Sequence, residues 1–169
     1  ARELAADTGQ PWNKEIANYF CELSLIEMTH SRNDAALSYL DEALKANRKC
    51  ARAYVLLGDI QAAAGDHASA IENWKRIEQQ NPPYLALVAQ RLLESHRALG
   101  RAEEGLTLLR GYLAGSPSLD LLDVAFQATL DLQGAEAAYT LVKDELRRNQ
   151  TMLGLDKLLE AQILVAPQE

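Results

Sequence analysis

A spacing of about 34 residues recurs along this chain, and it restricts the possible folds more than any other feature of the sequence. The clearest unit, 51–84, contains in order Tyr54, Leu57, Gly58, Gly65, Ala70, Trp74 and Pro82. One period earlier, unit 17–50 contains Phe20, Leu23, Ser24, Ala36, Leu40 and Ala43. One period later, with one extra residue, unit 86–119 contains Ala89, Leu92, Leu93, Gly100, Gly105, Leu109, Tyr112 and Pro117. A fixed period of this length is typical of arrays of stacked supersecondary units.

Each unit has the pattern of two helices joined by a short turn. Apolar residues follow a helical period, alternation typical of strands is nearly absent, and the abundant Ala, Leu, Glu and Lys favour helix. We expect helices of about 12–15 residues, close to the usual length in globular proteins. The breaks between them are expected at 30–33, 65–66, 81–83, 100–101, 115–117 and 133–134. The sequence therefore predicts an all-α fold of antiparallel helical hairpins.

The clearest unit also predicts how the two helices of a hairpin pack. Gly58 and Ala70 are small, and would let the two helices cross closely. Tyr54 and Trp74 are large, and would fill the space beside that crossing. Pro82 would end the second helix, because proline lacks the backbone N–H that a helix interior needs.

The two ends of the chain depart from the repeat. Segment 120–150 keeps Phe126, Gly134 and Leu146 but few other markers, so we expect a degenerate fourth repeat there. Segment 151–166 predicts a C-terminal helix that caps the array or binds a further module. Segment 1–10 is expected to be the end of a preceding repeat, which indicates a piece of a longer protein. The last helix would carry an apolar stripe of Met152, Leu155, Leu158, Leu159 and Ile163.

Unit 51–84 resembles the tetratricopeptide repeat almost position for position. The resemblance implies a tetratricopeptide-repeat α-solenoid, a right-handed superhelix of antiparallel helix hairpins whose first helices line a concave groove. It also implies a scaffold for protein–protein interaction. The whole chain, 1–169, would be a single array built on the repeats 17–50, 51–84 and 86–119.

Several stretches show a narrower resemblance, to the bacterial lipopolysaccharide assembly protein B family. Stretch 16–25, IANYFCELSL, looks like the helix that opens a middle repeat in that family. Stretch 145–152, ELRRNQTM, with Leu158 following, is similar to its last helical repeat. The pair at 51–52 and the stretch GDHASAI at 65–71 extend the resemblance over most of the chain.

This narrower resemblance implies an adaptor that regulates lipopolysaccharide synthesis. In the family, an N-terminal membrane helix tethers a cytoplasmic repeat array to the inner membrane, and a rubredoxin-like module with four metal-binding cysteines packs on its end. The family acts with a membrane-anchored ATP-dependent protease to control the deacetylase that commits precursors to lipid A. A membrane protease and a lipid A pathway enzyme are the implied partners. Iron is expected only in the rubredoxin-like module, so no cofactor is expected in this segment.

The repeat frame also predicts which side chains point into the groove, namely the second, fifth, sixth, ninth, twelfth and thirteenth positions of each unit. The polar residues there form the predicted partner-binding groove: Asn18, Glu22, Arg52, Asp59, Gln90, Arg91, Glu94 and Arg97. The apolar residues at such positions are Cys21, Leu25, Val55, Leu56 and Leu87. A groove of mixed charge suits an extended or helical segment of a partner protein. The alternative is that any one of these charges is merely solvated.

A particular kind of partner is disfavoured. Repeats that bind chaperone tails hold the terminal carboxylate of a peptide with Lys, Asn and Arg side chains in the groove. Here Arg91 alone conforms at the five corresponding positions. The other four are occupied by Cys21, Leu25, Leu56 and Leu87.

Charge and hydropathy exclude two further classes of partner. The formal net charge is −7 and the isoelectric point is near 5.0, which opposes binding to phosphate backbones and to anionic lipid. The sequence has no uninterrupted apolar run of about 18 residues, the least that usually spans a bilayer. We therefore expect neither nucleic-acid binding nor direct membrane insertion of this segment.

Few residues suggest metal or catalytic chemistry. Glu27 and His30 have the Glu-x-x-His spacing of carboxylate-bridged metal pairs, but no second copy accompanies them, so we expect a surface pair at a helix end. Cys21 and Cys50 lack the close Cys or His neighbours of a zinc site and are expected to be small buried residues. His96 falls at a position where repeats wedge an aromatic ring between helices, so we expect a core histidine.

No enzyme motif is found in the sequence: neither a nucleophile elbow, a P-loop, a His-Glu-x-x-His helix nor a dinucleotide fingerprint. The expectation is that the chain is not an enzyme. Two rivals to the adaptor hypothesis stay open. One is a generic assembly scaffold, for example in secretion or pilus biogenesis. The other is the repeat region of a protein like an N-acetylglucosaminyl transferase, whose chemistry would require a separate α/β domain.

Overall fold

A computed structural model describes residues 12–149 and 152–166 of the chain. The described residues form nine α-helices and two short 3-10 helices and include no strand, which confirms the predicted all-α fold. The chain divides into two compact units, Ala1–Asn81 and Pro82–Glu169. The prediction that 1–10 ends a preceding repeat lies outside the described residues.

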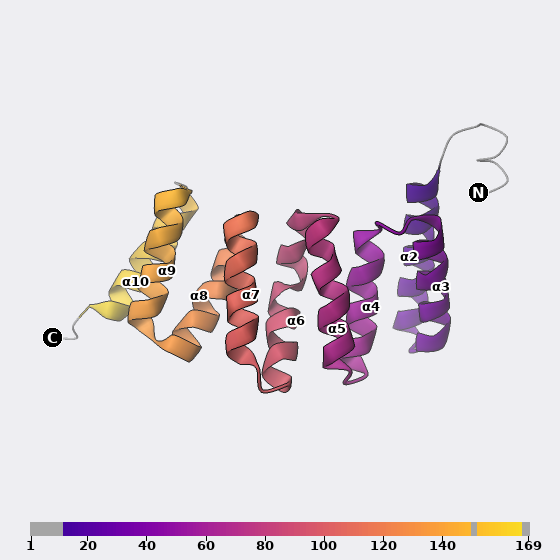
Figure 1. Cartoon of the computed structure of the whole chain (residues 1–169), viewed down its shortest axis with the longest axis horizontal. Coiled ribbons are helices and arrows are strands. Elements are labelled where there is room, and N and C mark those ends of the chain that lie inside the picture. Colours follow the sequence, from indigo (N-terminus) through magenta and orange to yellow (C-terminus); the bar gives the residue numbers. More distant parts are fainter. Residues whose placement is uncertain (1–11, 150–151, 167–169) are drawn as a thin grey trace. The chain divides into compact units, whose positions relative to one another are not determined.

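Unit 1 consists of two helical hairpins (Figure 1). Its helices are α2 (Asn13–Thr29), α3 (Asn33–Ala46), α4 (Ala51–Ala63) and α5 (His67–Lys75). Helix α2 packs on α3, α4 packs on α5, and both helices of the first hairpin contact α4. Small residues make these contacts close, because Ala17, Ala36, Ala43 and Ala53 are completely buried between the helices.

The predicted close crossing in the second hairpin is confirmed. A Cβ atom at Gly58 would lie 2.2 Å from Nε1 of Trp74, far inside any normal contact. The indole is fully buried, and its Nε1 donates a hydrogen bond to the backbone oxygen of Val55 at 3.2 Å. Tyr54 and Ala70 are buried beside it, as the repeat pattern predicted.

The prediction that Pro82 ends the second helix is wrong. Helix α5 already ends at Lys75, and the chain continues as a 3-10 helix over Arg76–Gln79. Ile77 is fully buried and holds this tighter turn against α4, so packing ends the α-helix before proline is reached. Pro82 instead begins the 3-10 helix Pro82–Tyr84 that leads into the next α-helix, a position where its missing N–H costs little.

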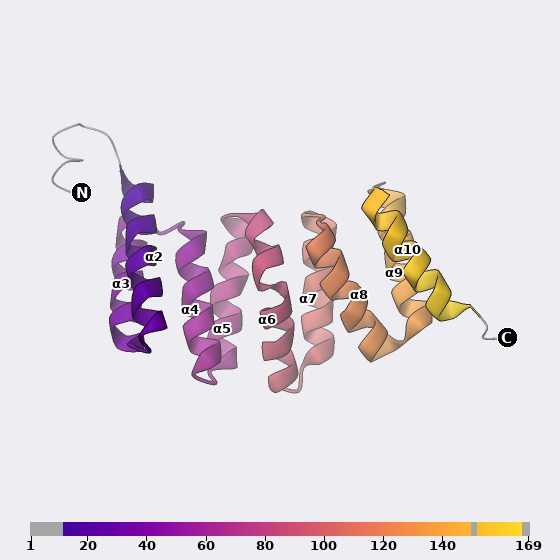
Figure 2. The same cartoon turned by 180° about the vertical axis from the view of Figure 1, so that it is seen from behind.

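Unit 2 contains the remaining five helices (Figure 2). They are α6 (Leu85–Ala98), α7 (Ala102–Gly115), α8 (Leu119–Gln133), α9 (Ala135–Arg148) and α10 (Met152–Val165). In the α6–α7 hairpin Leu93 occupies the position that Gly58 has in unit 1, and Gly105 occupies that of Ala70. A Cβ atom at Gly105 would lie 2.8 Å from Cβ of His96 and 3.3 Å from Cδ1 of Leu93, so this hairpin also crosses closely.

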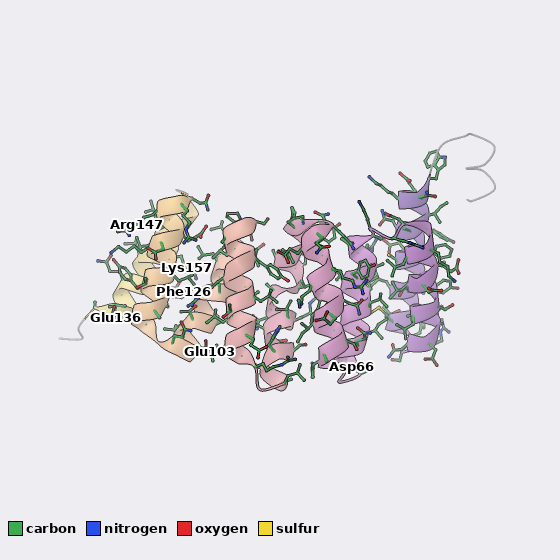
Figure 3. All side chains as sticks on the ribbon, in the orientation of Figure 1. Asp66, Glu103, Phe126, Glu136, Arg147 and Lys157 are labelled. Atoms are coloured by element: carbon green, nitrogen blue, oxygen red, sulfur yellow. The ribbon has the colours of Figure 1, made fainter. Side chains whose placement is uncertain are left out.

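The last helix is held on α8 by a lysine (Figure 3). Nζ of Lys157 lies 5.0 Å from the centre of the Phe126 ring, and Phe126 is completely buried. The same ammonium group pairs with Asp123 at 2.6 Å and with Glu160 at 2.8 Å. On α10, Leu155, Leu159 and Ile163 of the predicted apolar stripe are exposed.

The turns within the hairpins share a backbone conformation that recurs with the repeat. Gly65, Gly100 and Gly134 all have positive φ, between 70° and 87°. The corresponding turn of the first hairpin has Ser31, with a φ of 57°, 34 residues before Gly65. Each hairpin thus turns through one left-handed residue, and the predicted breaks at 30–33, 65–66, 100–101 and 133–134 are confirmed. The break between α3 and α4 falls at the boundary of the predicted units 17–50 and 51–84.

Candidate partner-binding surface

In unit 1 the predicted groove residues lie on α2 and α4. Asn18 and Glu22 are on α2, one helical turn apart, while Arg52 and Asp59 are partly exposed on α4. The guanidinium Nη1 of Arg52 lies 2.7 Å from Oε1 of Glu22. The two first helices of the unit are therefore joined by an ion pair at the surface.

Two apolar positions that we expected to face the groove are instead buried. Cys21 and Leu56 belong to the core between α2 and α4, with exposed fractions of 0% and 6%, so they cannot meet a partner in this conformation. The groove prediction is wrong for them because neighbouring first helices pack directly on each other, whereas the expectation that Cys21 is a small buried residue is confirmed. Sequence reasoning missed Tyr19 and Ile26, which are exposed on α2. Their spacing on one helical stripe with Glu22 was the available signal.

In unit 2 the predicted residues lie on α6. Gln90, Glu94 and Arg97 are exposed and Arg91 is partly exposed. Nε2 of Gln90 donates a hydrogen bond to Oε1 of Glu94 at 2.9 Å, and Arg91 donates one to the backbone oxygen of Leu87. Leu87 has an exposed fraction of 60%. This face of α6 thus presents a large apolar side chain beside charged groups of both signs.

An ion pair joins α6 to the next first helix of unit 2. Nη2 of Arg97 lies 2.8 Å from Oδ2 of Asp131 on α8. Asp131 follows Arg97 by 34 residues, so the two charges occupy the same position of successive repeats. We did not predict Asp131, because segment 120–150 keeps few markers of the repeat. The period itself was the signal that could have identified it.

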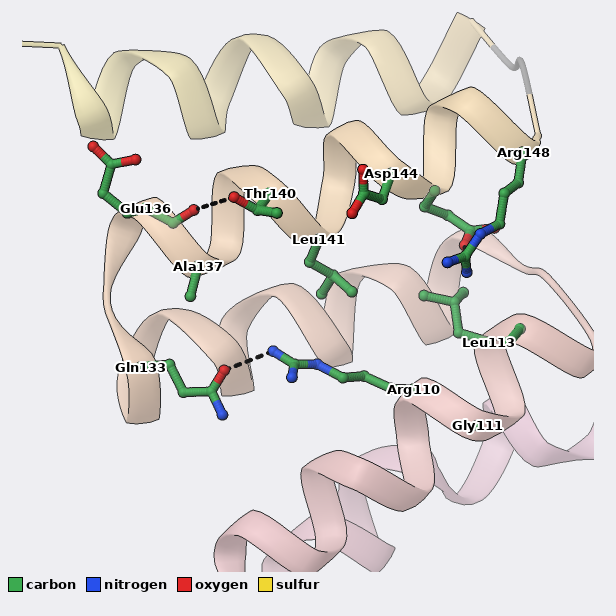
Figure 4. Close-up of a pocket in the computed structure, with 12 residues that line it drawn as sticks. Arg110, Gly111, Leu113, Gln133, Glu136, Ala137, Thr140, Leu141, Asp144 and Arg148 are labelled. Carbon is green, nitrogen blue, oxygen red and sulfur yellow. Dashed lines mark hydrogen bonds and ion pairs between the residues drawn. The ribbon is translucent and has the colours of Figure 1, made fainter.

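A separate hollow of about 690 Å³ lies between the second helices α7 and α9 of unit 2 (Figure 4). Arg110 crosses it and donates hydrogen bonds to Gln133 at 2.8 Å and to Thr129 at 3.2 Å. Gln133 in turn donates one to Glu103 at 2.9 Å. Sequence reasoning missed this polar network, since it concentrated on the first helices.

The residues considered for metal or core roles have defined environments. Glu27 pairs with Arg32, and Nδ1 of His30 lies 2.7 Å from the backbone oxygen of Ile26, so the two residues have separate partners at the end of α2. Cys50 and His96 are buried as predicted, each 6% exposed. Across residues 12–149 and 152–166, no group of three or more His, Cys, Asp or Glu side chains is arranged to hold a metal ion.

The exposed first-helix residues define what this surface can do. Exposed Tyr19, Ile26 and Leu87 offer apolar area, which burial under a partner would stabilise. The surface ion pairs of Arg52 in unit 1 and of Arg97 in unit 2 can be rearranged to meet charges on a partner. In the described part of the chain, no helix is both long enough and apolar enough to cross a membrane.

Known proteins share this repeat and this fold. Residues 21–84 match the family model of the tetratricopeptide repeat. The structure is similar to a thermophilic tetratricopeptide-repeat protein of Thermus thermophilus, with a TM-score of 0.54 and 23% identity, over 87% of this chain and 81% of that chain. It is also similar to the APC/C hetero-tetramer Cut9-Hcn1, with a TM-score of 0.51 and 16% identity, over 84% of this chain and 29% of that chain.

Fold and repeat together define the class: the described helices have the fold of a tetratricopeptide-repeat α-solenoid, and residues 21–84 carry the repeat itself. In sequence it is similar to Lipopolysaccharide assembly protein B of Escherichia coli strain K12, with 26% identity over 146 residues and 86% of this chain. The same protein of Escherichia coli O157:H7 matches equally well. The chain spans 38% of the length of these relatives.

Proposed function

We propose that this chain is the partner-binding repeat region of an adaptor that regulates lipopolysaccharide synthesis through proteolysis of a lipid A pathway enzyme. The observation that carries the proposal is the similarity to Lipopolysaccharide assembly protein B, which extends over 86% of the chain and so includes both units. In this role the chain acts in the cytoplasm, within a protein tethered to the inner membrane. It performs no catalysis and requires no cofactor.

The exposed first-helix residues would supply the binding surface. In unit 1 the partner would cover Tyr19 and Ile26 and meet the pair of Glu22 with Arg52. Aromatic residues and Arg are the residue types most often responsible for binding energy at protein interfaces. In unit 2 it would cover Leu87 and exchange ion pairs with Arg97. The partner in this proposal is a segment of the membrane protease or of the deacetylase.

A segment replacement in Escherichia coli tests the proposal. The repeats of Lipopolysaccharide assembly protein B that match this chain are replaced by the chain itself, in cells depleted of the native protein. The abundance of the deacetylase and the amount of lipopolysaccharide are then measured. We expect the hybrid to restore control of both quantities.

The matched control carries the corresponding repeats of the Thermus thermophilus protein, which has the same fold at 23% identity to this chain. We expect this control to accumulate without restoring regulation. Equal rescue by both hybrids would favour a generic scaffold. Uncontrolled deacetylase levels in cells that contain the intact hybrid would contradict the adaptor role.

A further inference from the structure

The two cysteines of the chain lie side by side in the core of unit 1. Cys21 lies within α2 and Cys50 is the residue at the N-terminal cap of α4. Their Sγ atoms are 3.9 Å apart, and both thiols are free. The next repeat has Val55 and Tyr84 at the equivalent positions, so the repeat itself does not require a sulfur pair.

The two thiols have different environments. Cys21 is completely buried, whereas Cys50 retains an exposed fraction of 6% at the start of α4. The two thiols share a hydrogen bond in which either sulfur can be the donor, and this bond is the main reason that the pKa of Cys50 lies below its ordinary value. Backbone N–H groups of Ala53 and Arg52 lower it further, while burial opposes them. The same hydrogen bond, with burial, raises the pKa of Cys21.

We propose that Cys21 and Cys50 form an oxidisable dithiol site that closes to an intramolecular disulfide when the protein meets a hydroperoxide. Geometry carries the proposal, because the sulfur atoms are already in contact and belong to two helices that pack together. The remaining approach, from 3.9 Å to a bond of about 2.05 Å, is about 1.9 Å. The proposal does not depend on the identity of any partner.

The reaction needs access to only one sulfur. The Cys50 thiolate attacks one oxygen of the hydroperoxide, the O–O bond breaks, and two electrons pass from sulfur to oxygen to leave a sulfenic acid and hydroxide or alkoxide. The Cys21 sulfur then attacks the Cys50 sulfur. The S–S bond forms, the S–O bond breaks, and the oxygen leaves as water with the proton of Cys21. Hydrogen peroxide is small enough to approach a nearly buried Cys50, which a bulky disulfide oxidant is not.

The disulfide would tie α2 to Cys50, the N-terminal cap of α4, across the junction of two hairpins. Glu22 follows Cys21 directly, and its ion pair with Arg52 at 2.7 Å lies over the same junction. Oxidation would therefore fix the relative position of two helices that carry exposed polar residues. Because a crosslink restricts the unfolded chain, it would also raise the melting temperature.

The test treats the whole chain with hydrogen peroxide and counts free thiols after denaturation, with intact mass and peptide mapping as the second measurement. We expect the wild type to lose both thiols and two hydrogen atoms, with a peptide that links positions 21 and 50. Its melting temperature should rise and return to the starting value after reduction. The matched variants Cys21→Ala and Cys50→Ala each keep a single thiol.

The two variants should behave differently. Without a resolving thiol, Cys21→Ala should stop at the sulfenic acid and take up dimedone at Cys50, whereas Cys50→Ala should react much more slowly. The proposal would be overturned if the wild type kept both thiols at a peroxide concentration that modifies the Cys21→Ala variant. Disulfide dimers in place of the internal link would also overturn it. If an alanine variant fails to fold, the linked peptide from the wild type decides the question alone.

Discussion

Gly58 and Trp74 are in contact across the α4–α5 hairpin, so closely that a methyl group on Gly58 would lie 2.2 Å from Nε1 of the indole. The indole cannot withdraw easily, because it is fully buried and its N–H is bound to Val55. The small residue on one helix and the large residue on the other are therefore a matched pair. Position 58 must stay without a side chain for this hairpin to close.

The first prediction concerns this pair. Gly58→Ala should lower the free energy of unfolding by about 1–3 kcal/mol, because it overpacks a filled core. Urea denaturation followed by circular dichroism measures the change. Gly111→Ala is the matched control, since a Cβ there meets nothing within 4 Å and the residue lies within helix α7. This control should gain about 0.5–1 kcal/mol from helix propensity. Equal stability of Gly58→Ala and wild type would contradict the packing role.

The second prediction concerns the turn of the first hairpin. Ser31 has a φ of 57°, a conformation that costs an ordinary residue roughly 1–2 kcal/mol. Glycine adopts it freely but loses about 0.5–1 kcal/mol more in chain entropy on folding. Ser31→Gly should therefore stabilise the chain by about 0.5–1 kcal/mol, measured from the melting temperature. The reciprocal change Gly65→Ser should destabilise it. A lower melting temperature for Ser31→Gly would contradict this account.

The third prediction concerns pH. The pKa of Asp66 lies below its ordinary value of 3.8, because the side chain and then the backbone N–H of Ser69 donate hydrogen bonds to its carboxylate at the start of α5. A lowered pKa in the folded state means that Asp66 stabilises the fold above pH 3.8 and loses this effect as the pH falls through the folded value.

The Asp66→Asn variant isolates this effect, since asparagine also caps helices but does not titrate. We expect the wild type to lose more stability than this variant when the pH falls from neutral to about 3, below the ordinary pKa of aspartate. Urea unfolding at each pH measures the difference. Parallel pH profiles of the two proteins would show that the carboxylate of Asp66 does not contribute through its charge.

The fourth prediction concerns metal content. We expect elemental analysis of the purified chain to find no stoichiometric zinc or iron. Dialysis against a chelator should leave the melting temperature unchanged, because the described side chains offer no group of three ligands. The expectation that this segment functions without a cofactor would be disproved if the purified chain held one equivalent of either metal and if a chelator removed that metal and lowered the melting temperature.

Much of the fold could be predicted from the sequence, since the repeat fixes which residues must be small and which must be large. Gly58 with Trp74 and the turns at Gly65 and Gly100 are local consequences of that pattern. The end of α5 could not be predicted in this way. Helix α5 ends where Ile77 becomes buried, and this burial is a tertiary contact that no local pattern records. The position of Pro82, taken alone, predicted a longer helix.

The candidate surface was predicted less completely. The repeat frame identified surface residues such as Glu22 and Gln90, but it did not show that Cys21 and Leu56 are covered by the neighbouring helix. Burial of these positions depends on how closely successive hairpins pack, and no local pattern records that distance. For the same reason the sequence did not reveal that Cys50 lies against Cys21.

The most direct test of the proposed function measures binding of the purified chain to the deacetylase of lipid A synthesis. Reversal of two charges on α6, in Arg91→Glu with Arg97→Glu, should weaken binding at least tenfold, about 1.4 kcal/mol, and leave helical content unchanged. Arg147→Glu, on the second helix α9 and 70% exposed, is the matched control and should bind like the wild type. Unchanged binding by the α6 variant, or no binding of the wild type to either the deacetylase or the membrane protease, would contradict the central claim.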